Sequence, residues 1–98
     1  MTRQFIVRPI AQAEMDEAIG WYAQRSVAAA QRFADALAAA LVAIRTDPLR
    51  YSVVEQGKRR YNLNSFPYDL YFTADEHEVI VLSCFHGRRN PARWRRRR

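Results

Sequence analysis

The sequence predicts an α+β domain in which a helical hairpin covers one face of a mainly antiparallel, four-stranded sheet, in the order β-α-α-β-β-β. Three observations predict this class. A short alternating segment opens the chain, two amphipathic helical segments with a tight connection follow, and three strand-like segments separated by turn residues come last. The chain has 98 residues, 49% of them apolar, which is enough to bury one core. We therefore expect residues 1–98 to form a single domain.

The first strand and the first helix follow from the spacing of apolar residues. Gln4–Arg8 alternates between two faces, as a short strand does, and Pro9 ends this segment. A helical pattern begins at Ala11, and its apolar stripe has the spacing of one helix face: Met15, Ala18, Ile19 and Tyr22. Trp21 lies off this stripe. We expect it to pack against the sheet, and contact with a partner is the alternative.

The second helix is longer and richer in alanine. Ser26 stands at its N-cap position, and the helix runs to about Arg45 with nine Ala, the best helix former. Its apolar stripe comprises Ala30, Phe33, Leu37, Leu41 and Ile44. Asp47-Pro48 ends the helix, because the residue before a proline avoids the α region. The short connection between the helices predicts an antiparallel hairpin.

Three strands are expected after Leu49, over residues 60–65, 68–73 and 78–85, with a turn at 74–77. In the first of them Tyr61 and Leu63 share a face. The last is apolar on both faces, which is typical of a central strand. This spacing predicts an antiparallel meander, with the basic residues on the sheet face away from the helices and at the C-terminal edge.

The C-terminal segment is rich in arginine. Asn90-Pro91 predicts a turn that opens a short C-terminal helix or a tail, and residues 94–98 form a basic tail. Trp94 lies between two arginines. It would stack on a nucleic-acid base, insert into a groove of a protein partner, or fold back onto the sheet.

The positive charge is concentrated in the second half of the chain. The net charge is +6, yet residues 1–57 carry six Arg against six acidic residues, whereas residues 58–98 carry ten Lys or Arg against four. Such a concentration attracts phosphate backbones or an acidic protein partner. The candidate target-binding residues follow the strands of this half: Arg59, Arg60, His86, Arg88, Arg89 and Trp94.

The sequence has no pattern typical of a metal or cofactor site. Cys84 is the one cysteine, which excludes an internal disulfide, and its apolar surroundings indicate a buried side chain rather than a nucleophile. No zinc-binding histidine motif and no phosphate-binding glycine loop is present, so we expect no metal and no cofactor. The N-terminus lacks a signal-peptide pattern, and no apolar run approaches transmembrane length. We therefore expect a cytoplasmic protein with no membrane partner.

Cleavage of RNA without a metal is a chemical alternative. It requires a base for the 2′-hydroxyl proton, cations to stabilise the phosphorane and an acid for the leaving oxygen. Arg59 or Arg60, with Arg88 or Arg89, could supply the cations, and His86 could transfer the proton. The alternative for His86 is a backbone hydrogen bond at the end of a strand. The alternative for the arginines is recognition of phosphates or carboxylates without chemistry.

In their order and spacing these segments resemble the RelE/ParE superfamily of toxins from type II toxin–antitoxin systems, and most closely its ParE-like branch. The resemblance spans nearly the whole chain. It includes an acidic first helix with Trp21-Tyr22, an Ala-rich second helix closed by Asp47-Pro48, and then Arg60, Phe66–Phe72, His86–Pro91 and Trp94.

The resemblance implies a small bacterial cytoplasmic toxin that is held inactive by a cognate antitoxin. ParE-like members inhibit DNA gyrase and so stall replication, with growth arrest and plasmid stabilization as consequences. RelE-like members cleave mRNA on the ribosome with basic residues on the sheet and a C-terminal Tyr or His.

Three hypotheses follow. The first is a non-enzymatic gyrase poison that binds through its C-terminal half. The second is a ribosome-dependent mRNA endoribonuclease that uses Arg60, His86 and Arg88 as catalytic residues. Trp94 departs from the nuclease pattern because an indole has no transferable proton near neutral pH, which leaves His86 as the substitute. The third is a basic domain that binds nucleic acid or a protein partner without toxicity.

Overall fold

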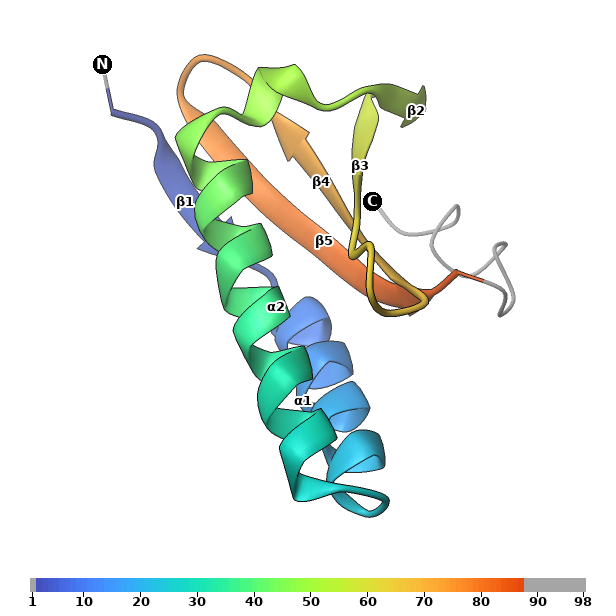
Figure 1. Cartoon of the computed structure of the whole chain (residues 1–98). Helices are drawn as coiled ribbons and strands as arrows, with labels where there is room; N and C mark the ends of the chain where they lie inside the picture. The colour runs from blue at the N-terminus through green and yellow to red at the C-terminus, as the bar shows by residue number, and fades with distance from the viewer. Residues whose placement is uncertain (1, 88–98) are drawn as a thin grey trace.

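The computed structural model describes residues 2–87, which form two helices packed on a five-stranded sheet (Figure 1). The α+β class and the order of the elements predicted from the sequence are confirmed, with one additional strand. The elements are β1 (Gln4–Val7), α1 (Pro9–Ala23), α2 (Val27–Thr46), the 3-10 turn η1 (Pro48–Arg50), β2 (Val53–Glu55), β3 (Lys58–Asn62), β4 (Tyr68–Ala74) and β5 (Glu78–His86). The predicted C-terminal helix or tail and its Arg-rich end at 94–98 lie outside the described residues.

The sheet is mixed, with strand order β1-β5-β4-β3-β2. Strand β1 pairs in parallel with β5, from Gln4 opposite Glu78 to Val7 opposite Val81. All other neighbours are antiparallel. The first strand of the chain therefore lies beside the last, and β5 is flanked on both sides along its first half. The residues from Val81 to Phe85 are all buried, in agreement with the apolar sequence of this strand.

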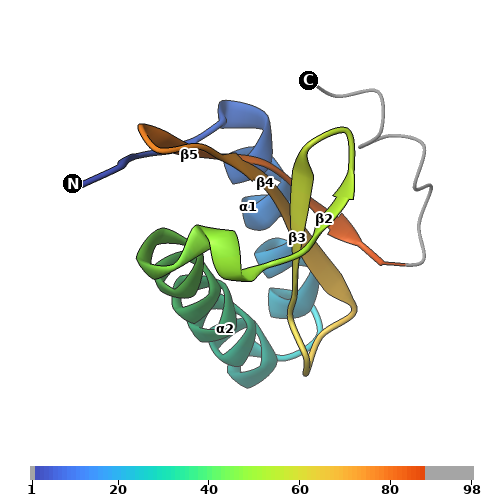
Figure 2. The same ribbon diagram turned by 90° about the horizontal axis from the view of Figure 1, so that it is seen from above.

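The predicted count of four strands is wrong because the sequence pattern missed β2. This strand has only three residues and forms one edge of the sheet, where Val53 and Val54 are exposed. It has no alternation of burial from which a strand could be recognised. A two-residue turn joins it to β3, in which Gln56 (φ 50°) and Gly57 (φ 77°) both have positive φ. Two-residue turns with positive φ match the twist of the two strands in a β-hairpin. Figure 2 shows the β2–β3 hairpin at the edge of the sheet far from β1.

The helical hairpin forms as predicted, except at its start. Helix α1 begins at Pro9 rather than at Ala11, because a proline is well suited to the first helical position, where no backbone donor is needed. Ser26 is the N-cap of α2, and its Oγ accepts a hydrogen bond from the Ala29 amide at 3.1 Å. Helix α2 ends at Thr46, one residue before Asp47-Pro48.

The core lies between the helical hairpin and one face of β4 and β5. Phe33 of α2 is fully buried, and its ring centroid lies 4.9 Å from that of Tyr22, 5.0 Å from Phe66 and 5.1 Å from Tyr68. The predicted stripe of α2 is confirmed, with Leu41 partly buried and Ala40 as a further member. The sheet contributes Leu70, Phe72, Val79, Val81 and Cys84 to the same cluster.

Helix α2 is also long and apolar enough to cross a membrane, when only its length and composition are considered. The sequence analysis did not predict this property, to which the nine Ala and the six larger apolar residues of the helix both contribute. A core helix of a soluble protein meets the same criterion. Here Phe33, Leu37 and Ile44 of the helix pack against the sheet.

Truncation of Phe33 is expected to destabilise the fold strongly. Phe33→Ala should lower the free energy of unfolding by about 3–5 kcal/mol, because it removes a fully buried ring at the centre of the aromatic cluster. Urea denaturation followed by circular dichroism measures the change. Val42→Ala is the control in the same helix. Its side chain is 64% exposed, so the cost should stay below about 0.5 kcal/mol. Similar losses in the two variants would contradict this account of the core.

Candidate functional site

The candidate site lies on the sheet face opposite the helices, which we call the open face. Side chains alternate along a strand, and the register places Arg59 beside Phe72 and Tyr61 beside Leu70, on the helix-covered face. Arg60 stands beside Tyr71 and lies on the open face. From β3, β4 and β5 the open face receives Lys58, Arg60, Asn62, Asp69, Tyr71, Thr73, Ser83 and Phe85. Of these side chains Arg60 and Asn62 are exposed and Thr73 is half-buried, whereas the other five are buried.

Arg59 has a structural role within the chain. Its guanidinium donates hydrogen bonds from Nη1 to the Tyr51 carbonyl at 2.5 Å and to the Leu49 carbonyl at 3.4 Å. These carbonyls lie on the segment that connects α2 to β2. Arg59 therefore anchors that connection to β3, and its predicted contact with a target would have to compete with these bonds.

The structure separates Arg60 from His86. Arg60 is exposed on the open face, whereas His86 is the register partner of Tyr68, whose side chain belongs to the core beneath the helices. The His86 ring is half-buried and meets the Tyr68 ring edge-on, with centroids 5.3 Å apart. The remaining predicted site residues, Arg88, Arg89 and Trp94, lie outside the described residues.

Two basic residues of the open face were not among the predicted site residues. Lys58 and Arg8 line a pocket of about 320 Å³, together with Gln56, Thr73 and Leu82. We call it the Arg8–Lys58 pocket. Lys58 is only 4% exposed and Arg8 is half-buried. The alternation of side chains along a strand could have indicated that Lys58 lies on the same face as Arg60, because the two are two residues apart. No local signal places Arg8 beside β5, because their pairing is set by the topology of the whole chain.

Hydrogen bonds and close contacts hold the chain in place at the end of β5, just before the predicted target-binding segment. The Gly87 amide donates a hydrogen bond to the Pro67 carbonyl at 2.7 Å. A Cβ atom at Gly87 would lie 3.5 Å from Oδ2 of Asp69. Asp69 is held in turn by Asn62, whose Nδ2 donates to Oδ1 at 2.7 Å. Asp69 of the open face therefore contacts Asn62 of β3 and lies beside Gly87 at the end of β5.

Cys84 is a core residue, as the sequence predicted. Its side chain is 3% exposed, and burial, with smaller contributions from the Glu14 and Asp69 carboxylates, raises the pKa of the thiol to about 12. The thiol therefore stays protonated near neutral pH and is a poor nucleophile. Glu14 of α1 also accepts a hydrogen bond from the Cys84 amide at 3.1 Å, beyond the point where β1 stops pairing with β5.

Trp21 does not pack against the sheet, so that prediction is wrong. Its side chain is 42% exposed, and the guanidinium of Arg25 lies 3.6 Å from the ring centroid, in a cation–π contact. The residues that α1 buries are Ala11, Met15 and Ala18, and this stripe leaves Trp21 at the edge of the hairpin.

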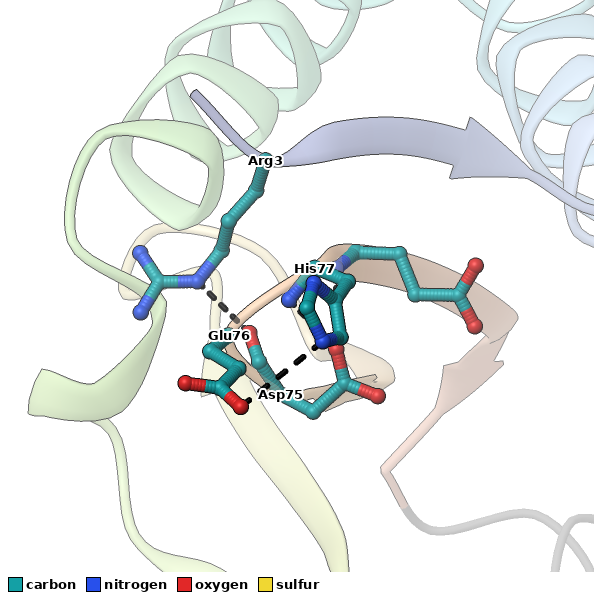
Figure 3. Close-up of polar contacts among 5 residues, drawn as sticks. Arg3, Asp75, Glu76 and His77 are labelled. Atoms are coloured by element: carbon teal, nitrogen blue, oxygen red, sulfur yellow. Dashed lines mark hydrogen bonds and ion pairs between the residues drawn. The ribbon is translucent and has the colours of Figure 1, made fainter. Parts of the chain in front are cut away.

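The turn between β4 and β5 gathers further titratable side chains, shown in Figure 3. The Asp75 carboxylate accepts hydrogen bonds from the amides of His77 at 2.8 Å and Glu78 at 2.9 Å, and these bonds lower its pKa below the ordinary 3.8. Arg3 donates to the Asp75 carbonyl at 2.7 Å. His77 lies 3.7 Å from Glu76, an ion pair when the imidazole is protonated. These contacts shape a turn. Within residues 2–87 no group of His, Cys, Asp and Glu could hold a metal ion.

A comparison with protein families decides the assignment. Residues 5–91 match the family described as the ParE toxin of type II toxin-antitoxin system, parDE. The chain belongs to this family. It is therefore a toxin of a type II toxin–antitoxin system, and a cognate antitoxin is its partner. A comparison with curated proteins finds no match.

This ParE-family toxin has a second concave surface on its helix side. It has a volume of about 680 Å³ and lies between α2 and the connection from β3 to β4. Ala36, Ala39, Leu63 and Phe66 supply apolar lining, with Arg32 and Asp35 among the other lining residues. The two concave surfaces differ in character, since the Arg8–Lys58 pocket is small and cationic and this groove is larger and more apolar.

Arg59 and Arg60 are adjacent, but their removal should have different effects on stability. Arg59→Ala should lower the free energy of unfolding by about 1.5–3 kcal/mol, because it breaks charged hydrogen bonds to two backbone carbonyls. Arg60→Ala is the matched control on the open face and should change it by less than about 0.5 kcal/mol. Urea denaturation measures both. Equal effects would show that Arg59 is not a structural anchor.

The Asp75 turn should make stability depend on pH in acid. Because the native pKa lies below the ordinary value, the charged carboxylate stabilises the fold above about pH 4 and this contribution is lost as the pH falls through the native pKa. Asp75→Asn should therefore melt at a lower temperature than the parent at neutral pH, with the difference shrinking towards about pH 2. Glu76→Gln, at an exposed neighbour, is the control and should show little difference at either pH. A pH-independent deficit in Asp75→Asn would contradict the expectation.

Proposed function

We propose that this toxin is a non-enzymatic poison that inhibits DNA gyrase and thereby replication in the bacterial cytoplasm, until its antitoxin neutralises it. Membership of the ParE family supports the proposal. The observation that carries it within the structure is the separation of Arg60 and His86 onto opposite faces of the sheet. In a nuclease, the general acid or base and the cation that stabilises the developing charge must both contact the same phosphate. Arg60 and His86 lie on opposite faces of the sheet and do not meet this requirement together.

The target-binding residues of the proposal are Arg60 on the open face and the segment that follows β5, with Arg88, Arg89 and Trp94. The hydrogen bond from Gly87 to Pro67 fixes the point from which this segment starts. Arginine and tryptophan are the residue types that most often dominate the energy of a protein interface. Arg59, held by backbone carbonyls, contributes by supporting β3 rather than by direct contact.

A purified gyrase supercoiling assay tests the proposal. Removal of residues 90–98 should raise the toxin concentration needed for half-inhibition by more than about 30-fold, the effect of losing an interface hot spot. Arg60→Ala should weaken inhibition in the same direction. Arg45→Ala, an exposed residue of α2, is the control with the same loss of charge and should inhibit like the parent. A parent toxin that leaves supercoiling unaffected, or a truncated toxin that still inhibits, would refute the proposal.

The second candidate is a RelE-like, ribosome-dependent mRNA endoribonuclease. One observation favours it: Lys58 and Arg60 lie on the same open face, where two cations could contact a phosphodiester. Primer extension on abundant transcripts, soon after expression of the toxin alone, separates the candidates. Growth arrest with intact transcripts would support the gyrase proposal. New 5′ ends in translated regions that disappear in Arg60→Ala would support the nuclease.

A further inference from the structure

The Arg8–Lys58 pocket extends across the open face from β3 to the end of β1. Lys58 of β3 neighbours Thr73 of β4, because Arg59 pairs with Phe72. Arg8 follows Val7, which pairs with Val81, and so stands beside Leu82 of β5. The pocket therefore has a threonine hydroxyl and an aliphatic side chain at its centre and a cation at each end.

The electrostatics of the pocket favour an anion. Among the described residues that line it, Arg8 and Lys58 are charged and both are positive. Glu55, the strand partner of Lys58, supplies one nearby negative charge, which leaves an excess of one positive charge. Helix α1 begins directly after Arg8 and has no acidic residue in its first turn, so the positive end of its dipole adds to the field. The surroundings thus suit one further negative group.

The size and lining of the pocket favour a carboxylate over a nucleic acid. Proteins that bind single strands combine cations along the backbone with aromatic rings on which bases stack. The five described lining residues include no aromatic ring. A volume of about 320 Å³ lies at the lower end of the range for ligand sites and can hold one inserted side chain. The Thr73 hydroxyl and the Gln56 amide can donate hydrogen bonds to an oxygen acceptor.

We propose that the Arg8–Lys58 pocket binds a Glu or Asp side chain from an acidic segment of the antitoxin. The inference rests on the toxin–antitoxin assignment of this chain and is independent of gyrase as the target. Lys58, which is buried, and Arg8, which is half-buried, form charge-assisted hydrogen bonds to the carboxylate. Arg60, which is exposed two residues further along β3, lies beside this contact.

The test uses the full-length toxin and an N-acetylated, C-amidated hexaglutamate peptide as the probe. At low ionic strength the peptide should bind and shift the amide resonances of Thr73, Leu82 and Gln56, and hexaglutamine should not bind. Arg8→Gln and Lys58→Gln should each raise the Kd about fivefold. Since Lys58 is buried, Arg8→Gln keeps the test valid if Lys58→Gln fails to fold.

Arg32→Gln is the matched control, because it removes the same charge from an exposed position on the helix side. It should leave the Kd within about twofold of the parent value. An equal loss of affinity in Arg32→Gln would overturn the proposal in favour of diffuse attraction to a cationic protein. Tighter binding of a hexauridylate RNA at the same amides would overturn it in favour of a nucleic-acid site. The readout is peptide binding by the isolated toxin, so a failed gyrase assay would not change this result.

Discussion

The structure depends on the burial of the α1–α2 hairpin against a single face of β4 and β5. The aromatic cluster around Phe33 joins both helices to the strands, because Tyr22 comes from α1, Phe33 from α2 and Tyr68 from β4. Each alanine side chain buries little area, and alanine is the commonest residue of α2. The large rings of the cluster therefore provide much of the contact area between the two layers.

This burial also decides which side chains reach the open face. Side chains alternate along a strand, so a register that places Leu70 and Phe72 under the helices necessarily turns Tyr71 and its neighbour Arg60 outward. A slip of one residue would exchange the two sets and turn Leu70 and Phe72 out of the core. The hydrophobic core and the cationic surface are thus two results of the same pairing, and neither can change without the other.

The sequence was sufficient for the parts of the fold that local patterns determine. The Phe33 stripe, the Ser26 cap and the apolar β5 each have a signal within about ten residues, and all three are confirmed. Strand β2 lacked such a signal, since its three residues have no alternating burial and depend on the turn at Gln56-Gly57. The exposure of Trp21 was missed because its neighbours on the helix face cannot show whether a partner element covers it.

The candidate site was harder to predict because it combines distant parts of the chain. The sequence marked Arg59 and Arg60 as an equivalent pair, yet strand geometry gives one a structural role and the other an exposed position. No pattern in the sequence near Arg8 indicates a functional role. The parallel pairing of β1 with β5 places it in the same pocket as Lys58.

The same geometry explains why a cationic surface on this fold must draw on several strands. Alternation allows a single strand to offer a basic side chain to one face only at every second position, so β3 contributes Lys58 and Arg60 and no more. Further cations have to come from the neighbouring strands, but β4 and β5 contain no Lys or Arg. The pairing of β1 with β5 supplies the missing charge, because Arg8 directly follows the last residue of β1 and is the N-cap of α1. The parallel pairing of β1 with β5 therefore extends the basic surface from β3 across the open face.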